Sequence, residues 1–147
     1  MKERGHNTAF YIETLVMILV FVVIILVLTK VFAIAKTDST EAQRLTDSVS
    51  IAQNAAEVVQ ASESRDELLS LLDENGSATL EKGKVTALYD KEKKPDKNGV
   101  YKVTVTWDPE KTKTGRLVSS RISVYYKNAE KPAYTMDTKV YVKGGRP

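Results

Sequence analysis

Few side chains in this sequence have the type and spacing that catalysis requires. His6, the single histidine among 147 residues, stands in a short basic N-terminal stretch, where we expect a solvated imidazole. Ser119, Ser120, Tyr125 and Tyr126 fall on an expected strand with no base nearby in sequence to activate a nucleophile. The seven glycines are dispersed and form no phosphate-binding loop. We therefore expect no enzyme activity.

Metal and nucleic-acid chemistry find little support in the sequence. Asp90, Glu92 and Asp96 are acids that could hold calcium, but their segment is crowded with lysines and lacks the ligand spacing of a calcium loop. The chain has no cysteine, which excludes disulfides and thiolate metal sites. The net charge is +3, and the lysines alternate with acids without forming a basic stripe. We expect no metal, no cofactor and no nucleic-acid partner.

Glu13 is the residue whose position most needs a reason. It lies two residues before a run, Leu15 to Leu28, in which every residue is apolar. A carboxylate inside a membrane costs up to about 3 kcal/mol at the bilayer centre and much less within one turn of the edge. Glu13 either reaches the headgroup region or neutralises a cation of another chain.

Residues 10–35 predict a membrane-spanning helix, since about 20 apolar residues cross a bilayer. Residues 1–9 then form a short basic leader, and the polar remainder, 36–147, is one exported domain behind a cytoplasmic N-terminus. A signal peptide cut after Ala35 is an alternative, because Ala33-Ile34-Ala35 fits an A-x-A cleavage site.

Beyond the apolar run, apolar residues recur at alternating spacings of three and four, which predicts an amphipathic continuation of the same helix. No glycine or proline interrupts residues 6–75. The expected apolar face covers a sheet, with Asp47 among the residues on the opposite, polar side. The members of the apolar face are Ala42, Leu45, Val49, Ala52, Ala56 and Val59, widened by Ile51, Ala55 and Val58.

The remaining chain predicts a short helix followed by an antiparallel sheet. Ser64 and Glu67 form a capping box for a helix over about 65–74, with its leucines in the core. After Gly83, apolar residues recur at every second position, which predicts strands. The segments are 85–89, 101–107, 118–126 and 134–142, separated by turn-rich loops. The fold class is α+β, a long N-terminal helix and a short second helix with a four-stranded antiparallel sheet on the amphipathic half.

This layout resembles the type IV pilin superfamily, which includes the pseudopilins of type II secretion and pilin-like proteins of Gram-positive bacteria. The motif that carries the resemblance is "AFYIETLVMILV", residues 9–20, which is similar to the phenylalanine-then-glutamate start of that family. In the family, the phenylalanine opens the mature chain, and the glutamate pairs with the N-terminal amine of a neighbouring subunit inside a filament.

The resemblance implies that Glu13 is the assembly acid and Phe10 the family's phenylalanine. Two residues separate them here, against three in the family, and Ala9 stands where a glycine normally precedes the cut. Cleavage by a prepilin peptidase after Thr8 would place Glu13 fifth and begin the chain with Ala9. The implied partners are other pilin-like subunits, the membrane and a prepilin peptidase.

The sequence therefore predicts a single-pass, pilin-like structural subunit that polymerises through its N-terminal helix into a pilus or pseudopilus. Two alternatives remain open. One is a monomeric membrane-anchored binding or scaffold protein of the cell envelope. The other is a secreted β-rich module released after Ala35.

Intact-mass analysis of the membrane-extracted protein tests the leader. We expect either the full chain or loss of residues 1–8 or 1–9, because the charged stretch ends at His6 and the apolar helix begins near Phe10. An N-terminus at Lys36 would remove the anchor and the pilin-like interpretation with it.

Overall fold

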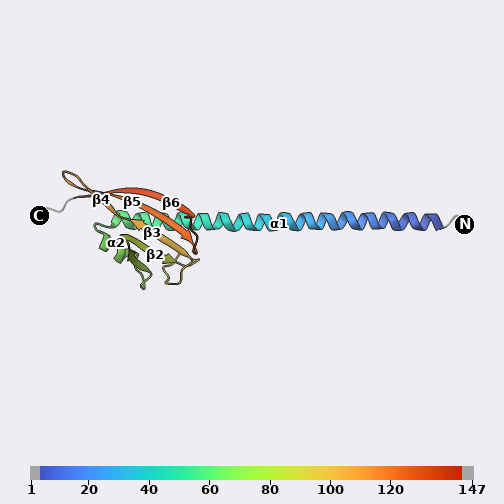
Figure 1. Ribbon diagram of the computed structural model, residues 1–147, viewed down its shortest axis with the longest axis horizontal. Helices are drawn as coiled ribbons and strands as arrows, with labels where there is room; N and C mark the ends of the chain where they lie inside the picture. Colours follow the sequence, from blue (N-terminus) through green and yellow to red (C-terminus); the bar gives the residue numbers. More distant parts are fainter. Residues whose placement is uncertain (1–3, 144–147) are drawn as a thin grey trace. The chain divides into compact units, whose positions relative to one another are not determined.

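The computed structural model describes residues 4–143, with side chains from Thr8 onward (Figure 1). The elements follow the order α1, α2 and β1 to β6, so the chain is α+β. It divides into two compact units, Met1–Ala42 and Gln43–Pro147. The first unit is purely helical in its described part, and the second holds the sheet.

Helix α1 runs without interruption from Arg4–Ala61. It begins earlier than the expected start at Phe10, and nothing in the following stretch can break it, since glycine and proline are absent from 6–75. Threonine hydroxyls along its exposed part bond back to the carbonyl four residues earlier, as Thr14 does to Phe10 at 2.9 Å and Thr29 to Ile25 at 2.8 Å. These bonds satisfy polar hydroxyls in an otherwise apolar segment.

By length and composition, α1 is able to cross a membrane. Its large apolar side chains between Phe10 and Ile34 are all exposed within the described chain. A helix that is apolar on every side is stable when lipid or other helices surround it. The structure thus confirms a long apolar N-terminal helix.

Helix α2, Arg65–Leu72, begins at the capping box expected from the sequence. The Ser64 hydroxyl accepts from the Glu67 N–H at 3.2 Å, as a capping box requires. The Glu67 carboxylate accepts at 2.7 Å from the N–H of Glu63, one residue before the N-cap, rather than from Ser64 itself. The helix ends two residues before the expected boundary, and Asn75 and Gly76 then take positive φ values of 59° and 71°. Of its leucines, Leu68 and Leu72 are buried, Leu69 is half-buried and Leu71 is exposed.

The sheet is antiparallel throughout and has six strands, so the expectation of four was wrong in number. Its order is β1-β2-β3-β5-β4, with β6 on the other side of β5. The bounds are β1 Ala78–Glu81, β2 Lys84–Tyr89, β3 Tyr101–Thr106, β4 Asp108–Lys111, β5 Gly115–Tyr126 and β6 Tyr134–Lys143. The four expected segments correspond to β2, β3, β5 and β6.

Of the two additional strands, β4 lies in a segment that the sequence pattern assigns to a loop, and β1 lies between the expected second helix and the first expected strand, where the pattern predicts no element. β4 continues β3 in unbroken register on β5, because Val105 pairs with Ile122 and Asp108 with Ser119. β1 forms a tight hairpin with β2 through Lys82 and Gly83, both at positive φ. Neither strand alternates: β1 buries only its first residue, and β4 is exposed throughout, so periodicity could not reveal them.

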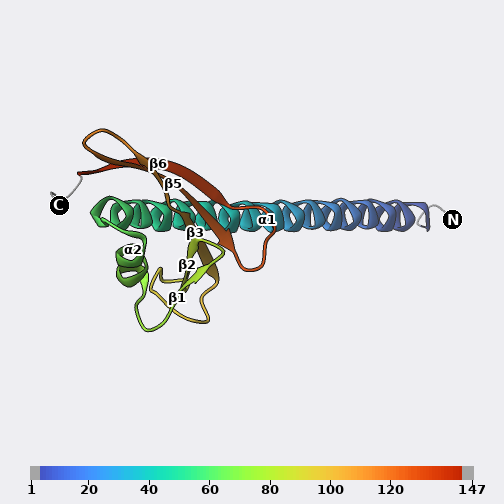
Figure 2. The same cartoon turned by 60° about the vertical axis from the view of Figure 1, so that its left-hand side comes forward.

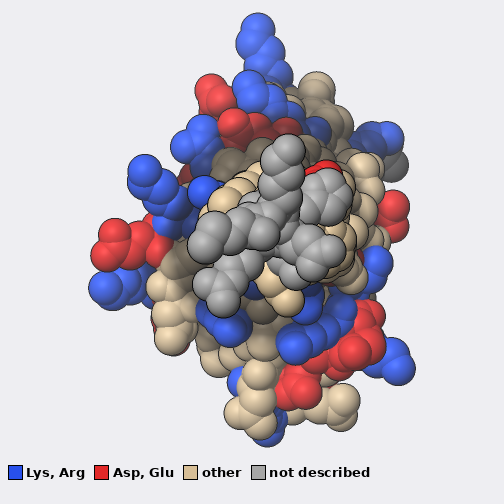
Figure 3. Space-filling model, turned by 90° about the vertical axis from the view of Figure 1, so that its right-hand side faces the viewer, with Lys and Arg blue, Asp and Glu red and all other residues tan. Residues whose placement is uncertain are grey.

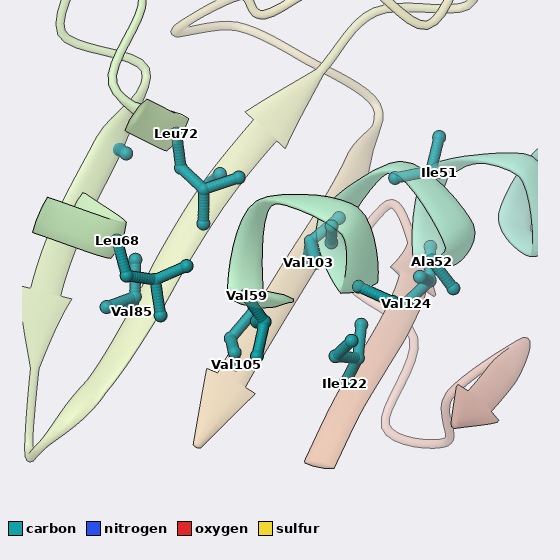
Figure 4. Close-up of a cluster of buried hydrophobic side chains, with 14 of the residues drawn as sticks. Ile51, Ala52, Val59, Leu68, Leu72, Val85, Val103, Val105, Ile122 and Val124 are labelled. Carbon is teal, nitrogen blue, oxygen red and sulfur yellow. The ribbon is translucent and has the colours of Figure 1, made fainter. Parts of the chain in front are cut away.

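The core of the second unit forms where α1 lies on one face of the sheet (Figure 4). Ala52 and Ala55 are fully buried there, and their small side chains let the helix backbone approach the strands closely. The strands contribute β-branched residues, which pack well on a pleated surface. These are Val85, Val103, Val105, Val118, Ile122 and Val124, all at most 1 % exposed.

The buried face of α1 differs from the expected one at its N-terminal end. Ala42 and Leu45 are exposed, and burial begins at Ser48, whose hydroxyl bonds to the Arg44 carbonyl at 2.7 Å. Asp47, which the pattern placed on the polar side, is half-buried in the sheet-facing cluster described below. The sheet's actual position, rather than helical periodicity alone, decides which turn is covered.

Ala52→Asp tests this packing. The substitution places an unpaired carboxylate in the core, so we expect the second unit to lose several kcal/mol of stability. Thermal unfolding of the detergent-solubilised chain, followed by circular dichroism, measures the loss. Gln53→Asp, on the exposed side of the same helix turn, is the control and should unfold near the wild-type temperature. Equal unfolding temperatures for both variants would show that Ala52 is not buried by the sheet.

Candidate assembly surface

Glu13 and Phe10 lie in the first unit on the regular, uninterrupted helix α1. The Phe10 side chain is 66 % exposed and meets Tyr11 edge to face, with ring centroids 6.2 Å apart. Glu13 is exposed as well. The helix thus presents the acid and the aromatic residue on its outside, where lipid or another chain can reach both.

Glu13 has no counter-charge within reach on its own helix. Between Thr8 and Ala35 the only charged residues are Glu13 and Lys30. They are 17 residues apart, whereas side chains on a helix meet at a spacing of three or four residues. Among the described residues, the ion pairs are Lys93–Asp47 and Arg121–Asp137, both in the second unit. Any cation that neutralises Glu13 in an apolar environment must therefore come from elsewhere.

The residues at the expected processing positions are helical. Thr8 and Ala9 lie in α1 and are exposed. Ala33 and Ala35, the ends of the A-x-A segment, lie in the middle of the same unbroken helix.

A polar and aromatic cluster that sequence reasoning missed fixes α1 to the sheet in the second unit. The Tyr101 hydroxyl donates to Asp47 at 3.1 Å, and the Lys93 ammonium lies 3.9 Å from the same carboxylate. The Arg44 guanidinium stacks 4.4 Å from the centre of the Tyr126 ring, and this ring meets Tyr101 edge to face at 5.3 Å. Helix and strands thus meet here through specific bonds.

Burial, followed by the hydrogen bond to Asp47, raises the pKa of Tyr101 to about 12. Both effects favour the neutral phenol, because ionisation would place an anion against the Asp47 carboxylate. No local sequence signal links two residues that lie 54 positions apart. The arrangement joins helix α1 to strand β3.

The segment considered for calcium is a set of turns. The Asp90 carboxylate accepts from the Lys94 N–H at 2.8 Å, and the Asp96 carboxylate accepts from the Asn98 N–H at 2.7 Å. Among the described residues, no group of three or more acids, histidines or cysteines gathers to hold a metal ion. The two carboxylates therefore act as turn-forming groups.

The serines considered as nucleophiles lie on β5 and on opposite faces of the sheet. Ser119 is half-buried on the outer face, and Ser120 is buried with its hydroxyl unbonded. A polar depression on the outer face includes Ser119, Arg121 and Asp137, but its arginine and aspartate bond each other at 2.7 Å. Figure 3 shows basic and acidic side chains interleaved over the face it presents, with no patch of a single sign.

Comparisons with protein-family models, with curated proteins and with solved structures find no match for this chain.

Tyr101→Phe tests the cluster. Removing the hydroxyl leaves the half-buried Asp47 without its donor, so we expect a loss of about 1 kcal/mol in urea unfolding followed by Trp107 fluorescence. Tyr125→Phe is the control, because it deletes a tyrosine hydroxyl for which the structure records no hydrogen bond.

The pH dependence gives a second measure of the same contact. Because the pKa of Tyr101 is higher in the folded chain, the unfolded chain loses this proton first, and stability falls as pH rises from 10 to 12. Tyr101→Phe should flatten that fall relative to Tyr125→Phe. Identical alkaline profiles for the two variants would contradict the contact.

Proposed function

We propose that this protein is a single-pass structural subunit that polymerises with similar chains through helix α1, in a pilus-like or pseudopilus-like assembly. The observation that carries the proposal is an apolar helical segment, exposed on every side, with one carboxylate near its start. The same helix continues into a folded α+β unit.

The exposed apolar segment of α1 supports the part of the proposal in which the protein first resides in a membrane. Its side chains require lipid or other helices around them, since water would be an unfavourable surrounding for so large an apolar area. A cytoplasmic N-terminus and an exported second unit would place the polar domain at the cell surface. This topology is part of the proposal.

Glu13 supports the part of the proposal in which subunits assemble through α1. In a bilayer it lies within one turn of an edge, but in a bundle of helices withdrawn from lipid there is no nearby headgroup layer to reach. A carboxylate in that low-dielectric surrounding is stable only beside a cation, and none lies within reach on its own helix. The resemblance to pilins supplies the partner class, a neighbouring subunit, and the cation, an N-terminal amine made available by a prepilin peptidase.

A monomeric membrane anchor is the second candidate. The observation that favours it is the spacing of Glu13 and Lys30, which bracket an uncharged stretch of helix from Thr14 to Thr29. Their separation of 17 residues corresponds to about 25 Å, close to the thickness of the hydrocarbon core. Both charges could then reach opposite headgroup layers without a partner.

Cysteine crosslinking separates the two candidates. The chain has no cysteine, so Val16→Cys and Ile24→Cys in one chain report neighbouring α1 helices without background. In native membranes, a subunit should give a ladder of crosslinked species. Glu13→Gln, which removes the charge but keeps the size, should abolish the ladder at unchanged membrane abundance. Glu13→Asp should give an intermediate ladder, because it shortens the reach of the carboxylate.

Glu41→Gln is the matched control, since it removes a carboxylate from the same helix outside the apolar run. It should leave the ladder intact. Equal ladders for the Glu13 variants and this control would mean that Glu13 only reaches the headgroups, and the monomeric anchor would be the better account.

A further inference from the structure

The sheet leaves three strand edges without a neighbouring strand, and two of them are blocked. At β1, the Ala78 N–H donates to the Asp73 carboxylate at 3.0 Å. At β4, Pro109 has no N–H to offer, and the adjoining Trp107 carbonyl accepts from the Arg65 guanidinium at 3.1 Å. Short edges, prolines and capping side chains are the means by which proteins prevent unwanted strand pairing.

The third edge, β6, is longer, and its described residues include neither a proline nor a backbone group capped by a side chain. It spans ten residues, against four each for β1 and β4. Figures 1 and 2 show it at the margin of the sheet, with β5 as its neighbour on one side. In the described chain, no backbone hydrogen bond reaches it from the other side. A long unpaired strand is a template for another strand.

The hydrogen bonds around β5 identify which residues of β6 face the open side. Arg121 donates its N–H to Thr106 on the β3 side of β5, whereas the Val124 carbonyl accepts from Ala133 on the β6 side. Backbone groups alternate sides along a strand, so the even-numbered residues of β5 bond even-numbered partners on β6. The odd-numbered residues of β6 therefore offer free backbone groups, namely Thr135, Asp137, Lys139 and Tyr141.

The side chains of β6 give the edge two distinct faces. On the face toward α1, Tyr134, Met136 and Val140 pack against the core but remain only half-buried. On the outer face, Asp137 and Lys139 are exposed and carry opposite charges, and the Asp137 carboxylate also accepts from Arg121 of β5 at 2.7 Å. A strand that pairs here must be apolar on one face and must match an acid and a base two residues apart on the other.

We propose that β6 pairs antiparallel with β6 of a second copy of this chain, about a two-fold axis at Thr138. In this register Asp137 lies opposite Lys139 of the other copy, and the reverse pair forms at the same time. Met136 meets Val140, and Tyr134 meets Val142, on the apolar face. Every pair in the interface is chemically compatible.

The neighbouring two-fold registers are much less favourable. Centring the axis on Asp137 places two carboxylates opposite each other, and centring it on Lys139 does the same with two ammonium groups. Like charges directly opposite in a sheet destabilise the pair. The register at Thr138 forms about eight backbone hydrogen bonds, two for each of its four hydrogen-bonded pairs.

This pairing also fixes the orientation of the partner. A two-fold axis perpendicular to the sheet keeps the second unit's α1 segment on the same face and reverses its direction. The second copy is therefore an oppositely directed chain, such as one presented from a facing surface or a neighbouring assembly. The contact involves only the second unit and is independent of the proposed role of Glu13.

A disulfide at the axis tests the register directly. In the cysteine-free full chain, solubilised in detergent, Thr138→Cys places the two thiols in a non-hydrogen-bonded pair, where the Cα separation of about 4.5 Å suits a disulfide. We expect rapid formation of a covalent dimer under mild oxidation. Thr135→Cys, exposed on the same strand, should crosslink at least tenfold more slowly, because the two copies of residue 135 would lie about 20 Å apart.

Charge substitutions then test complementarity. Lys139→Glu in the Thr138→Cys chain opposes two carboxylates twice in the interface and should slow dimer formation at least tenfold. Lys143→Glu changes charge equally on the same face of β6 but has no charged partner in this register, so it should have little effect.

Equal rates for Thr138→Cys and Thr135→Cys, or equal slowing by both glutamate substitutions, would overturn the proposed pairing. Glu13→Gln separates this result from the proposed assembly through α1, since it should leave the Thr138 disulfide unchanged. Loss of the α1 ladder in the Glu13→Gln chain, with the Thr138 dimer intact, would support both proposals, and the same loss without any Thr138 dimer would overturn only the β6 pairing.

Discussion

The contact between the small-residue face of α1 and the sheet is the interaction on which the rest of the structure depends. Ala52 and Ala55 let the helix lie close to β-branched side chains from three strands, and this packing gives the second unit its core. The sheet could not fold alone, because its apolar face would remain in water. One helix thus serves as a core element at its C-terminal end and as an exposed apolar surface at its N-terminal end.

The sharing of one helix between two surroundings explains the specific bonds in the second unit. Where α1 meets the sheet, Asp47 and Arg44 engage Tyr101 and Tyr126. Apolar packing has little directionality. A hydrogen bond and a ring contact, in contrast, define how far the helix is rotated about its axis and where it lies along that axis. We infer that this cluster fixes the register between helix and strands, which alanines alone would leave poorly determined.

The two proposed association surfaces follow from different physical requirements. The α1 surface is apolar with a single acid, and its proposed association depends on pairing that carboxylate with a cation in a low-dielectric surrounding. The β6 edge offers backbone donors and acceptors, and its association depends on completing hydrogen bonds that the other edges have already satisfied or removed.

The sequence by itself determined the long uninterrupted helix, the apolar run with Glu13, the capped α2 and four of the six strands, because each is written in local periodicity or local capping. Only the tertiary structure decided that Ala42 and Leu45 lie outside the core, that Asp47 turns toward Tyr101, and that β1 and β4 join the sheet. Burial of a helix face depends on where the sheet ends, and pairing of a polar strand depends on its neighbour's backbone. Neither property is carried by the residue types of the segment itself.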